Sequence, residues 1–523
     1  MKRGLDADEE PGAKRAKAEA KEALPQQLFE STPQFGATPV VASEEAVSLS
    51  ETQRQIIRAV CESKRNVHFN GVAGTGKSLV LRKLYDALAL KYKLDEFAFV
   101  APTGTAAVNI GGATLHSLAA CGVPNVMKDF FKLHSRFHAT KWRKLRVVVM
   151  DEVSMFSGAF LDAIDKSVRA LRRTPDEVFG GIQVVCCGDF AQLGPITSRR
   201  LRDDSWHGQS LLEDATRTAR FQDAGYAFQS NFWREANFEM FTLTEVFRQE
   251  DRAFSNMLSD LRLGKVGPEI EDLLGRECAR PLEERGLDFG GIEPTVLYPR
   301  NADVQTLNNT RLKQLALPEL QFDAIDSCSA MSQKREQLMK HAFFRDCRAE
   351  AKVTLRAGAQ VMLIANLDLK SGARSLCNGS RGVVEKFVPC GVKQYPSVRF
   401  LNGITLVVTP FAFKHKLYGE GELVREQVPL KLAWAMSIHK SQGATLDCAK
   451  VHLGDVFAPG QAYVALSRVR SKDGLYVTGF SAQKIRADPT VLQFYDSGCD
   501  PTVVPPWFEK PPEEEEEDGQ DDY

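Results

Sequence analysis

The stretch FNGVAGTGKSLVLRKLY, residues 69–85, joins the end of an apolar strand to a glycine-rich turn, a Lys-Ser pair and a helical pattern. It matches G-x-x-x-x-G-K-[ST], and the strand–turn–helix context is the one that this motif requires. Backbone N–H groups and the helix N-terminus would face phosphates, the lysine would reach the β and γ oxygens, and the serine hydroxyl would bind Mg²⁺. The sequence therefore predicts a site for the phosphates of a nucleotide and for Mg²⁺, formed by Gly71, Val72, Ala73, Gly74, Thr75, Gly76, Lys77 and Ser78. By itself such a loop is shared by kinases, GTPases, motors and helicases.

Apolar strand-like runs alternate with helical stretches on either side of this loop. From about residue 50 to 195 the runs are NVHFN, FAFVA, RVVVMD and IQVVCCGD, and a second set contains TVLYP, AQVMLIA, VPLKLAWAM and GLYVTGF. This alternation is typical of parallel sheets with crossover helices. A glycine-rich, alternating segment inside the second set favours a small antiparallel barrel. We expect two α/β units and a β insertion.

The run VVVMDE places Asp151 and Glu152 at the end of a second strand. Asp151 would hold Mg²⁺ through water, and Glu152 would polarise the attacking water. That chemistry is hydrolysis, although two acids that cap the following helix remain the structural alternative.

Three further polar residues fit a hydrolytic site. Gln192 follows a third strand in CCGDFAQLGP, where an amide can sense a γ-phosphate because it both donates and accepts hydrogen bonds. Arg248 and Arg468 are candidate arginine fingers outside the first unit. If both reach the loop, ATP lies between the two units, although an isolated helical arginine is more often solvated or ion-paired.

Eight ordered motifs carry a family resemblance: GVAGTGKS, APTGTAA, TLHS, VVVMDEVSM, GGIQVVCCGDFAQLGP, LTEVFRQ, LAWAMSIHKSQGATLD and GQAYVALSRVRS. In this order they resemble the Pif-type (petite integration frequency) DNA helicases, and DAIDKSVRALRR is similar to the segment that separates this family from its relatives. The resemblance covers about residues 49–480. It implies two RecA-like phosphate-loop domains, ATP-driven 5′-to-3′ movement on single-stranded DNA and unwinding of duplex, with G-quadruplex and RNA–DNA structures as further substrates.

The resemblance also implies roles residue by residue. Lys77, Glu152, Arg248 and Arg468 match catalytic positions, Ser78 and Asp151 match metal positions, and Gln53, Gln192 and Gly443 match nucleotide positions. Residues of motifs that hold the DNA strand are Thr103, Thr105, His116, His439, Lys440, Ser441, Gln461 and Tyr463. Short polar groups of this kind suit phosphate contacts, which carry no sequence information.

The implied domain boundaries are approximate. The first RecA-like domain would span 49–240 with a wedge insertion near 108–130, and the second would span 241–319 and 428–490. An inserted domain with a Src-homology-three-like barrel would lie between them, at 320–427. Two departures from the family are Gly194-Pro195, where two prolines are usual, and a longer arm at 197–225 with no assigned role.

The two ends of the chain differ in charge. Residues 1–48 have no sustained apolar period, so we expect disorder, with Lys2-Arg3 and KRAK at 14–17 resembling a bipartite nuclear-import signal. A solvated charged tail is the alternative. We expect a disordered acidic tail at 491–523. Removing the eight acidic groups of its last part, Glu513 to Tyr523, from the net charge of −1 leaves +7 on residues 1–512, which suits a polyanionic partner.

Composition bounds the remaining expectations. No run reaches the ~18 apolar residues of a membrane span, and 43% hydrophobic with 26% charged residues is ordinary soluble usage. We expect a monomeric motor in the nucleus, bound by an import receptor, with a mitochondrial fraction as the alternative, acting in replication, repair, recombination or telomere maintenance. A protein-stripping translocase and a non-motor phosphotransferase with the same loop are the alternative functions.

Overall fold

The computed structural model describes residues 49–196, 221–249, 251–285, 291–329, 332–339, 342–367, 376, 378–417 and 421–508. The basic clusters before residue 49, most of the arm at 197–225 and the acidic run after residue 508 lie outside the described residues. Among the described helices, none combines the length and the apolar character that crossing a bilayer requires.

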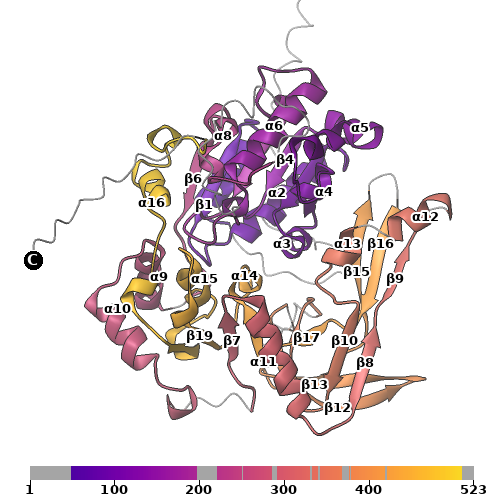
Figure 1. The fold of residues 1–523 in the computed structure, drawn as a ribbon, viewed down its shortest axis with the longest axis vertical. Helices are drawn as coiled ribbons and strands as arrows, with labels where there is room; N and C mark the ends of the chain where they lie inside the picture. The colour runs from indigo at the N-terminus through magenta and orange to yellow at the C-terminus, as the bar shows by residue number, and fades with distance from the viewer. Residues whose placement is uncertain are drawn as a thin grey trace, which may run out of the picture.

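The first unit is built on a six-stranded, wholly parallel sheet in the order β3-β2-β4-β5-β1-β6 (Figure 1). Its strands are β1 (Val67–Gly71), β2 (Phe97–Ala101), β3 (Ala113–Thr114), β4 (Val147–Met150), β5 (Gln183–Cys187) and β6 (Glu239–Leu243). The four central runs were predicted as strands and are confirmed. They are almost entirely buried, because helices cover both faces of a parallel sheet.

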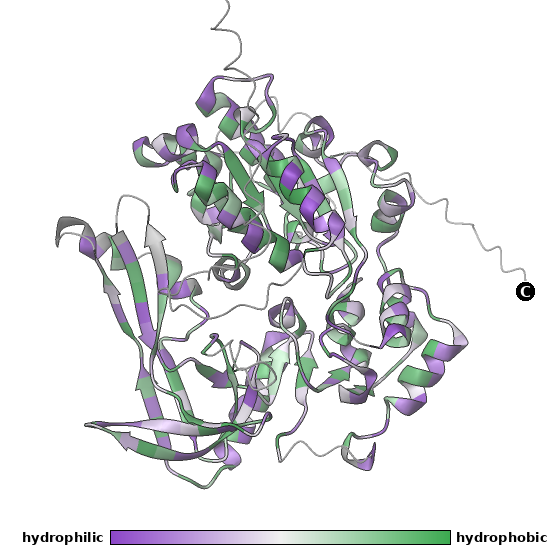
Figure 2. Cartoon of the chain, turned by 180° about the vertical axis from the view of Figure 1, so that it is seen from behind, coloured by the Kyte–Doolittle hydropathy of each residue, from purple (hydrophilic) through white to green (hydrophobic). Residues whose placement is uncertain are grey.

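Two hydrophobic cores lie on the two faces of this sheet. Residues of α1 (Glu51–Cys61) and α2 (Lys77–Lys91) contribute to one core. Those of α4 (Leu115–Leu118), α5 (Arg136–Lys144), α6 (Gly158–Arg172) and α8 (Asn231–Glu235) contribute to the other. Figure 2 shows the hydrophobic strands at the centre of the unit, between helices that turn hydrophilic residues outward.

The region proposed as a wedge, near 108–130, begins at the end of α3 (Gly104–Asn109). It contains β3, α4 and the start of the 3₁₀ turn η2 (Met127–His134). Its action as a wedge stays a prediction.

The second unit carries a smaller parallel sheet in the order β18-β7-β19-β20. These strands are β7 (Thr295–Tyr298), β18 (Ala435–Ser437), β19 (Ala449–His452) and β20 (Leu475–Thr478). The helices of this part of the chain are α9 (Arg252–Arg262), α10 (Pro268–Asp272), α11 (Asn301–Gln314), α14 (Ile438–Ser441) and α15 (Gln461–Leu466).

The segment between β7 and β18 forms antiparallel sheets. One sheet has the order β14-β13-β12-β11-β17, a second has β15-β16-β9, and β10 pairs with β8. The bounds are β8 (Glu319–Asp323), β9 (Ile325–Cys328), β10 (Lys352–Arg356), β11 (Gln360–Leu363), β12 (Arg381–Cys390), β13 (Lys393–Phe400), β14 (Thr405–Val407), β15 (Phe411–Leu417), β16 (Gly421–Gln427) and β17 (Leu430–Leu432). Two short helices, α12 (Ser332–Met339) and α13 (Ala342–Asp346), lie between β9 and β10. Closure into a barrel stays a prediction.

Two predicted strands do not lie wholly in the second parallel sheet. VPLKLAWAM divides into β17, which pairs antiparallel with β11, and β18, which lies in the parallel sheet. The strand pattern put AQVMLIA in the second parallel sheet, whereas the domain bounds implied by the resemblance put it in the inserted domain at 320–427. The strand β11 pairs antiparallel with β12 and β17, which agrees with the domain bounds and not with the strand pattern. A short apolar run that is buried on both faces looks the same in either kind of sheet, so the pattern could not decide between them.

The expected disordered tail at 491–523 is wrong in its first part. Residues 489–508, hereafter the C-terminal segment, form α16 (Pro489–Asp496), a 3₁₀ turn at Pro501–Val503 and a final irregular stretch that ends in a turn. Val491, Phe494 and Val504 lie in a core of the first unit. The prediction extended the disorder expected of the acidic run back to residue 491, although these residues are apolar.

Candidate nucleotide and nucleic-acid site

The phosphate loop connects β1 to α2. Gly74 and Gly76 have φ angles of +94° and +83°, a region that favours glycine. A Cβ on Gly76 would lie 2.7 Å from Nε2 of Gln53, so a side chain there would displace this amide from its place beside the loop. Inside the loop, the Thr75 hydroxyl donates to the carbonyl of Val72 at 2.9 Å.

Lys77 lies at the first position of α2, and its ammonium faces back over the loop. It donates to the carbonyls of Gly71 at 2.6 Å and Val72 at 3.2 Å. Ser78, the next residue, is exposed. The ammonium is therefore held at the loop by neutral acceptors, which the oxygens of a phosphate could replace.

Gln53 joins the start of α1 to this loop. Its side chain completes a capping box with Ser50, and its Nε2 donates to the carbonyl of Thr75 at 3.3 Å. These bonds fix a buried amide beside the loop. Its proposed contact with adenine stays a prediction.

Asp151 and Glu152 follow β4 directly. Glu152 has a φ of +51°, which is uncommon for a residue with a side chain, and its N–H donates to Asp151 Oδ1 at 2.9 Å. Burial raises the pKa of both carboxyl groups. For Asp151 the charge of Glu152 adds to this effect, and for both groups Lys77 opposes it. The helix-capping alternative loses support, because Glu152 makes no side-chain cap to the turn after it, and Ser157 caps α6.

The second unit reaches these carboxylates through Gln442, which sequence reasoning missed. Its Nε2 lies 2.9 Å from Glu152 Oε2 and 3.4 Å from Gln192 Oε1. Gln192 is buried at the end of the first unit's β5 region, so the predicted base and the predicted γ-phosphate sensor share one partner. The only sequence signal was the position of Gln442 directly after the motif residues 439–441.

Of the two predicted arginine fingers, Arg468 reaches the residue next to Gln442, with NH1 3.5 Å from the carbonyl of Ser441. Arg468 is 2% exposed and donates to the carbonyl of Val464 at 2.8 Å and to the Ser467 hydroxyl at 2.7 Å. Burial and the nearby charge of Arg248 lower the pKa of Arg468 to about 9. Arg248 donates to the carbonyl of Ser467 at 3.2 Å, so both guanidinium groups rest against the same turn after α15.

Two residues predicted to contact nucleic acid are buried instead near the loop and inside the second unit. The hydroxyl of Tyr463 accepts from the N–H of Ala73 at 2.9 Å, which puts this ring against the phosphate loop. Gln461 accepts from the N–H groups of Phe457 and Ala458 at 3.1 and 3.3 Å. Neither side chain presents a free surface, and a DNA contact for either has no support in this arrangement.

The other predicted DNA residues lie on both units. Thr103 is exposed at the start of α3, where its hydroxyl accepts from the N–H of Ala106 at 3.2 Å, whereas the side chain of Thr105 lies outside the description. His116 stacks on Phe160 with ring centroids 4.3 Å apart, and burial lowers its pKa.

On the second unit, α14 presents neighbouring residues differently. Lys440 is exposed, and His439 is half-buried with a pKa that burial lowers. Ser441 is fully buried and donates to the carbonyl of Ile438 at 2.7 Å, so its hydroxyl is already engaged.

Gly443 brings the two DNA motifs together. Its φ is +77°, and a Cβ there would lie 4.0 Å from Nδ2 of Asn109, at the end of α3. Asn109 also accepts from NH2 of Arg348 at 2.7 Å, which joins the inserted region to the first unit. Arg348 is a second residue that the sequence did not single out.

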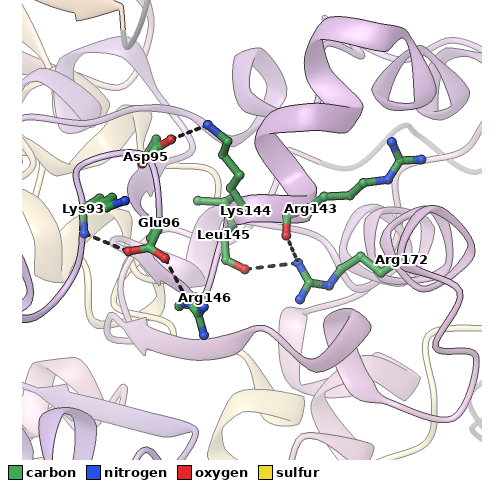
Figure 3. Close-up of a pocket in the computed structure, with 8 residues that line it drawn as sticks. All are labelled: Lys93, Asp95, Glu96, Arg143, Lys144, Leu145, Arg146 and Arg172. Carbon is green, nitrogen blue, oxygen red and sulfur yellow. Dashed lines mark hydrogen bonds and ion pairs between the residues drawn. The ribbon is translucent and has the colours of Figure 1, made fainter.

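A hollow of about 350 Å³ lies elsewhere on the first unit (Figure 3). Its residues immediately precede β2 and β4, so it lies at the opposite end of the strands from the phosphate loop. Lys144 pairs with Asp95 at 2.7 Å, and Arg146 pairs with Glu96 at 3.0 Å. Arg172 donates to carbonyls at the end of α5, so the charges around this hollow hold the fold together.

Two family models match the chain. One is described as PIF1-like helicase and matches residues 48–272, and the other, DNA helicase Pif1, 2B domain, matches residues 345–387. An ATP-dependent DNA helicase PIF1 of Xenopus laevis is 38% identical over 459 residues, which are 87% of this chain and 65% of that protein. The chain thus spans just under two thirds of this relative.

Solved structures match over the same range. The Pif1 helicase from Candida albicans is 34% identical with a TM-score of 0.64, covering 86% of this chain and 99% of that one. The Pif1 helicase from Bacteroides in complex with ADP-AlF3 and single-stranded DNA is 28% identical with a TM-score of 0.56, covering 86% and 97%. These matches confirm the predicted α/β class with two RecA-like units.

Proposed function

The chain belongs to the PIF1-like helicase family, and on that premise we propose that it is an ATP- and Mg²⁺-dependent DNA helicase that moves 5′ to 3′ on single strands. The observation that carries the proposal is the contact of Gln442 in the second unit with Glu152 and Gln192 in the first. Because this contact crosses the boundary between the units, a change at the γ-phosphate would alter how the units meet. That coupling is what a motor needs and a simple phosphotransferase does not.

The residues present fit ATP with a metal ion. The phosphate loop offers main-chain donors and the Lys77 ammonium, while Ser78 and Asp151 supply the hard oxygen atoms that Mg²⁺ prefers. When bound, the metal would neutralise charge on the β and γ oxygens. Glu152 would take the proton of the attacking water, and its raised pKa suits that task.

Arg248 and Arg468 would stabilise charge on the γ-phosphoryl group. Both now donate to groups of the turn after α15, so they would have to turn from these neutral acceptors toward the phosphate. Arg468 would carry the larger part, since its charge already acts on Glu152 across the boundary.

The DNA strand would run across Thr103 and His116 of the first unit and His439 and Lys440 of the second. The proposal is supported by the position of Gly443 beside Asn109, which sets the two motifs next to each other. The Bacteroides relative is bound to single-stranded DNA. Polar and cationic groups of this kind would grip phosphates without reading sequence.

The proposal is tested by unwinding of partial duplexes that carry a single-stranded tail at one end only, either 5′ or 3′. We expect ATP-dependent strand separation only with the 5′ tail, and loss of it in Lys77→Ala. Separation from the 3′ tail alone would contradict the direction. Removal of a bound protein from DNA without strand separation would instead identify a stripping translocase.

We further propose that the protein acts as a monomer in the nucleus, carried there by an import receptor that binds Lys2-Arg3 and Lys14–Lys17. A fluorescent fusion of the full chain should be nuclear and should become diffuse when Lys14, Arg15 and Lys17 are changed to Ala. An unchanged nuclear signal would show that these clusters are ordinary solvated charge. Light scattering of pure protein tests the monomer.

A further inference from the structure

The C-terminal segment returns to the first unit after β20 of the second. The ring of Phe494 stacks on Phe228 with centroids 4.2 Å apart. Farther along, Trp507 Nε1 donates to Asp162 Oδ2 at 2.6 Å, so the segment is fixed to the first unit at both of its ends.

Tyr495, the residue after Phe494 in α16, contacts both units at Asp189, a fully buried carboxylate that follows β5. Arg262 of α9 approaches it with two nitrogen atoms, Nε at 3.0 Å and NH2 at 2.8 Å. The Tyr495 hydroxyl donates to Asp189 Oδ1 at 3.0 Å and accepts from the N–H of Phe190 at 2.9 Å. The Arg262 guanidinium also lies 4.5 Å from the centre of the Tyr495 ring.

The electrostatic balance at this joint favours a charged carboxylate. Burial acts to raise the pKa of Asp189, but the charge and hydrogen bonds of Arg262 outweigh it, and the pKa lies below its usual range. Removal of any one partner of such a buried group is costly, because the remaining charge is left less well compensated.

Asp189 also holds the predicted γ-phosphate sensor. Its carbonyl accepts from the N–H of Gln192 at 3.0 Å, and its carboxylate lies 3.4 Å from Gln192 Nε2. The other end of that amide faces Gln442, the partner of Glu152. A continuous set of polar contacts therefore runs from Tyr495 to the predicted catalytic base.

We propose that Tyr495 is a positioning residue for ATP hydrolysis: it fixes Asp189 and, through it, Gln192, so that the C-terminal segment is part of the device that senses the γ-phosphate. This inference rests on the proposed function. Tyr495 does not touch the nucleotide. It acts by keeping the Asp189 carboxylate turned between Arg262 and Gln192 when the units move.

The test compares two substitutions in the full chain that each remove one hydrogen bond from this segment to a buried aspartate and retain a ring. Tyr495→Phe breaks the bond to Asp189, and Trp507→Phe breaks the bond to Asp162, whose carboxylate otherwise accepts from the N–H groups of Asn231 and Phe232. ATP turnover with and without single-stranded DNA gives kcat and KM, and thermal unfolding gives stability. We expect Tyr495→Phe to lower DNA-stimulated kcat about tenfold with KM for ATP within about twofold.

Both variants should lower the unfolding temperature by similar amounts, because each loses one hydrogen bond to a buried aspartate. Trp507→Phe should nevertheless leave kcat within about twofold of native. Unchanged kcat in Tyr495→Phe would overturn the inference, as would an equal loss in both variants, because the segment would then act only as a structural support. Native protein whose turnover ignores DNA would overturn the proposed function instead, and the two variants would then be compared on the DNA-independent kcat. Absence of any ATP turnover would overturn both.

Discussion

The two units differ in how they contribute to the nucleotide site. The first unit supplies one continuous loop, residues 71–78, and side chains at the ends of two adjacent strands. The second supplies single side chains from separate elements, Gln442 after α14, Tyr463 within α15 and Arg468 after it, and each is held by hydrogen bonds. Binding is thus built into one unit, whereas hydrolysis depends on where the other unit stands.

The cation of the first unit, Lys77, and that of the second, Arg468, are held in the same way. Lys77 donates to carbonyls of its own loop, and Arg468 donates to groups of its own helix end. Since neither is held by a carboxylate, each can exchange a neutral acceptor for a phosphate oxygen without breaking an ion pair. This arrangement makes both cations available to ATP. Only Lys77 can reach the phosphates whatever the relative position of the two units.

The largest expected effect is on the binding side. Lys77→Ala should lower DNA-stimulated ATP turnover by at least about 10³-fold, because it removes the only loop cation at the β and γ phosphates. Arg82, exposed on the same helix, provides the control, and Arg82→Ala should be close to native. Comparable turnover in Lys77→Ala and the control would contradict the assignment of phosphate binding to the loop of the first unit.

Glu152→Gln should lower kcat by about 10²–10³-fold, since an amide is a poor general base. The amide can still face Gln442, so nucleotide binding should persist. Binding of a fluorescent ATP analogue together with turnover checks this separation. Normal turnover would assign the base to another residue.

Tyr463→Phe sharpens the comparison, because the Tyr463 hydroxyl connects the second unit to the phosphate loop at Ala73. We expect kcat/KM for ATP to fall about fivefold, the equivalent of about 1 kcal/mol for one hydrogen bond. Tyr476→Phe, in β20, is the matched control. If Tyr463→Phe instead weakens DNA binding with ATP kinetics unchanged, the residue serves the DNA strand.

The smallest effect concerns α14. Lys440→Ala should weaken single-strand binding uniformly across sequences and reduce the slope of log affinity against log salt by about one. Ser441→Ala should leave that slope unchanged, because its hydroxyl is bound inside the helix. Fluorescence anisotropy at several salt concentrations measures both. A larger loss in Ser441→Ala would show that α14 rearranges on DNA.

Local patterns predicted most of the first unit. Its four central strands could be recognised from apolar runs, and the loop at 71–78 from the spacing of its glycines and its Lys-Ser pair. Both signals lie in residues that are neighbours in the sequence. The eight motifs then identified the family. Asp151 and Glu152 could be placed because they directly follow such a run.

The remaining features depend on contacts between distant residues. Gln442, Arg348 and Tyr495 belong to no pattern that a local pass recognises, and their partners lie more than 200 residues away. Tyr463 and Ser441 were predicted at DNA because their motif was read as a whole, whereas their burial depends on tertiary packing. The strand pattern assigned Gln360–Leu363 to the wrong sheet for the same reason, because the pairing of a strand depends on distant residues.

The most direct measurement is ATP turnover with and without single-stranded DNA, for the native chain and for Arg468→Ala. A large stimulation of the native chain by DNA, and a loss of about 10³-fold or more in the variant, are predicted, since an arginine finger contributes that much. The result would show that the second unit completes the site. A rate that responds neither to DNA nor to the substitution would contradict the account and leave a phosphate-loop enzyme without a motor.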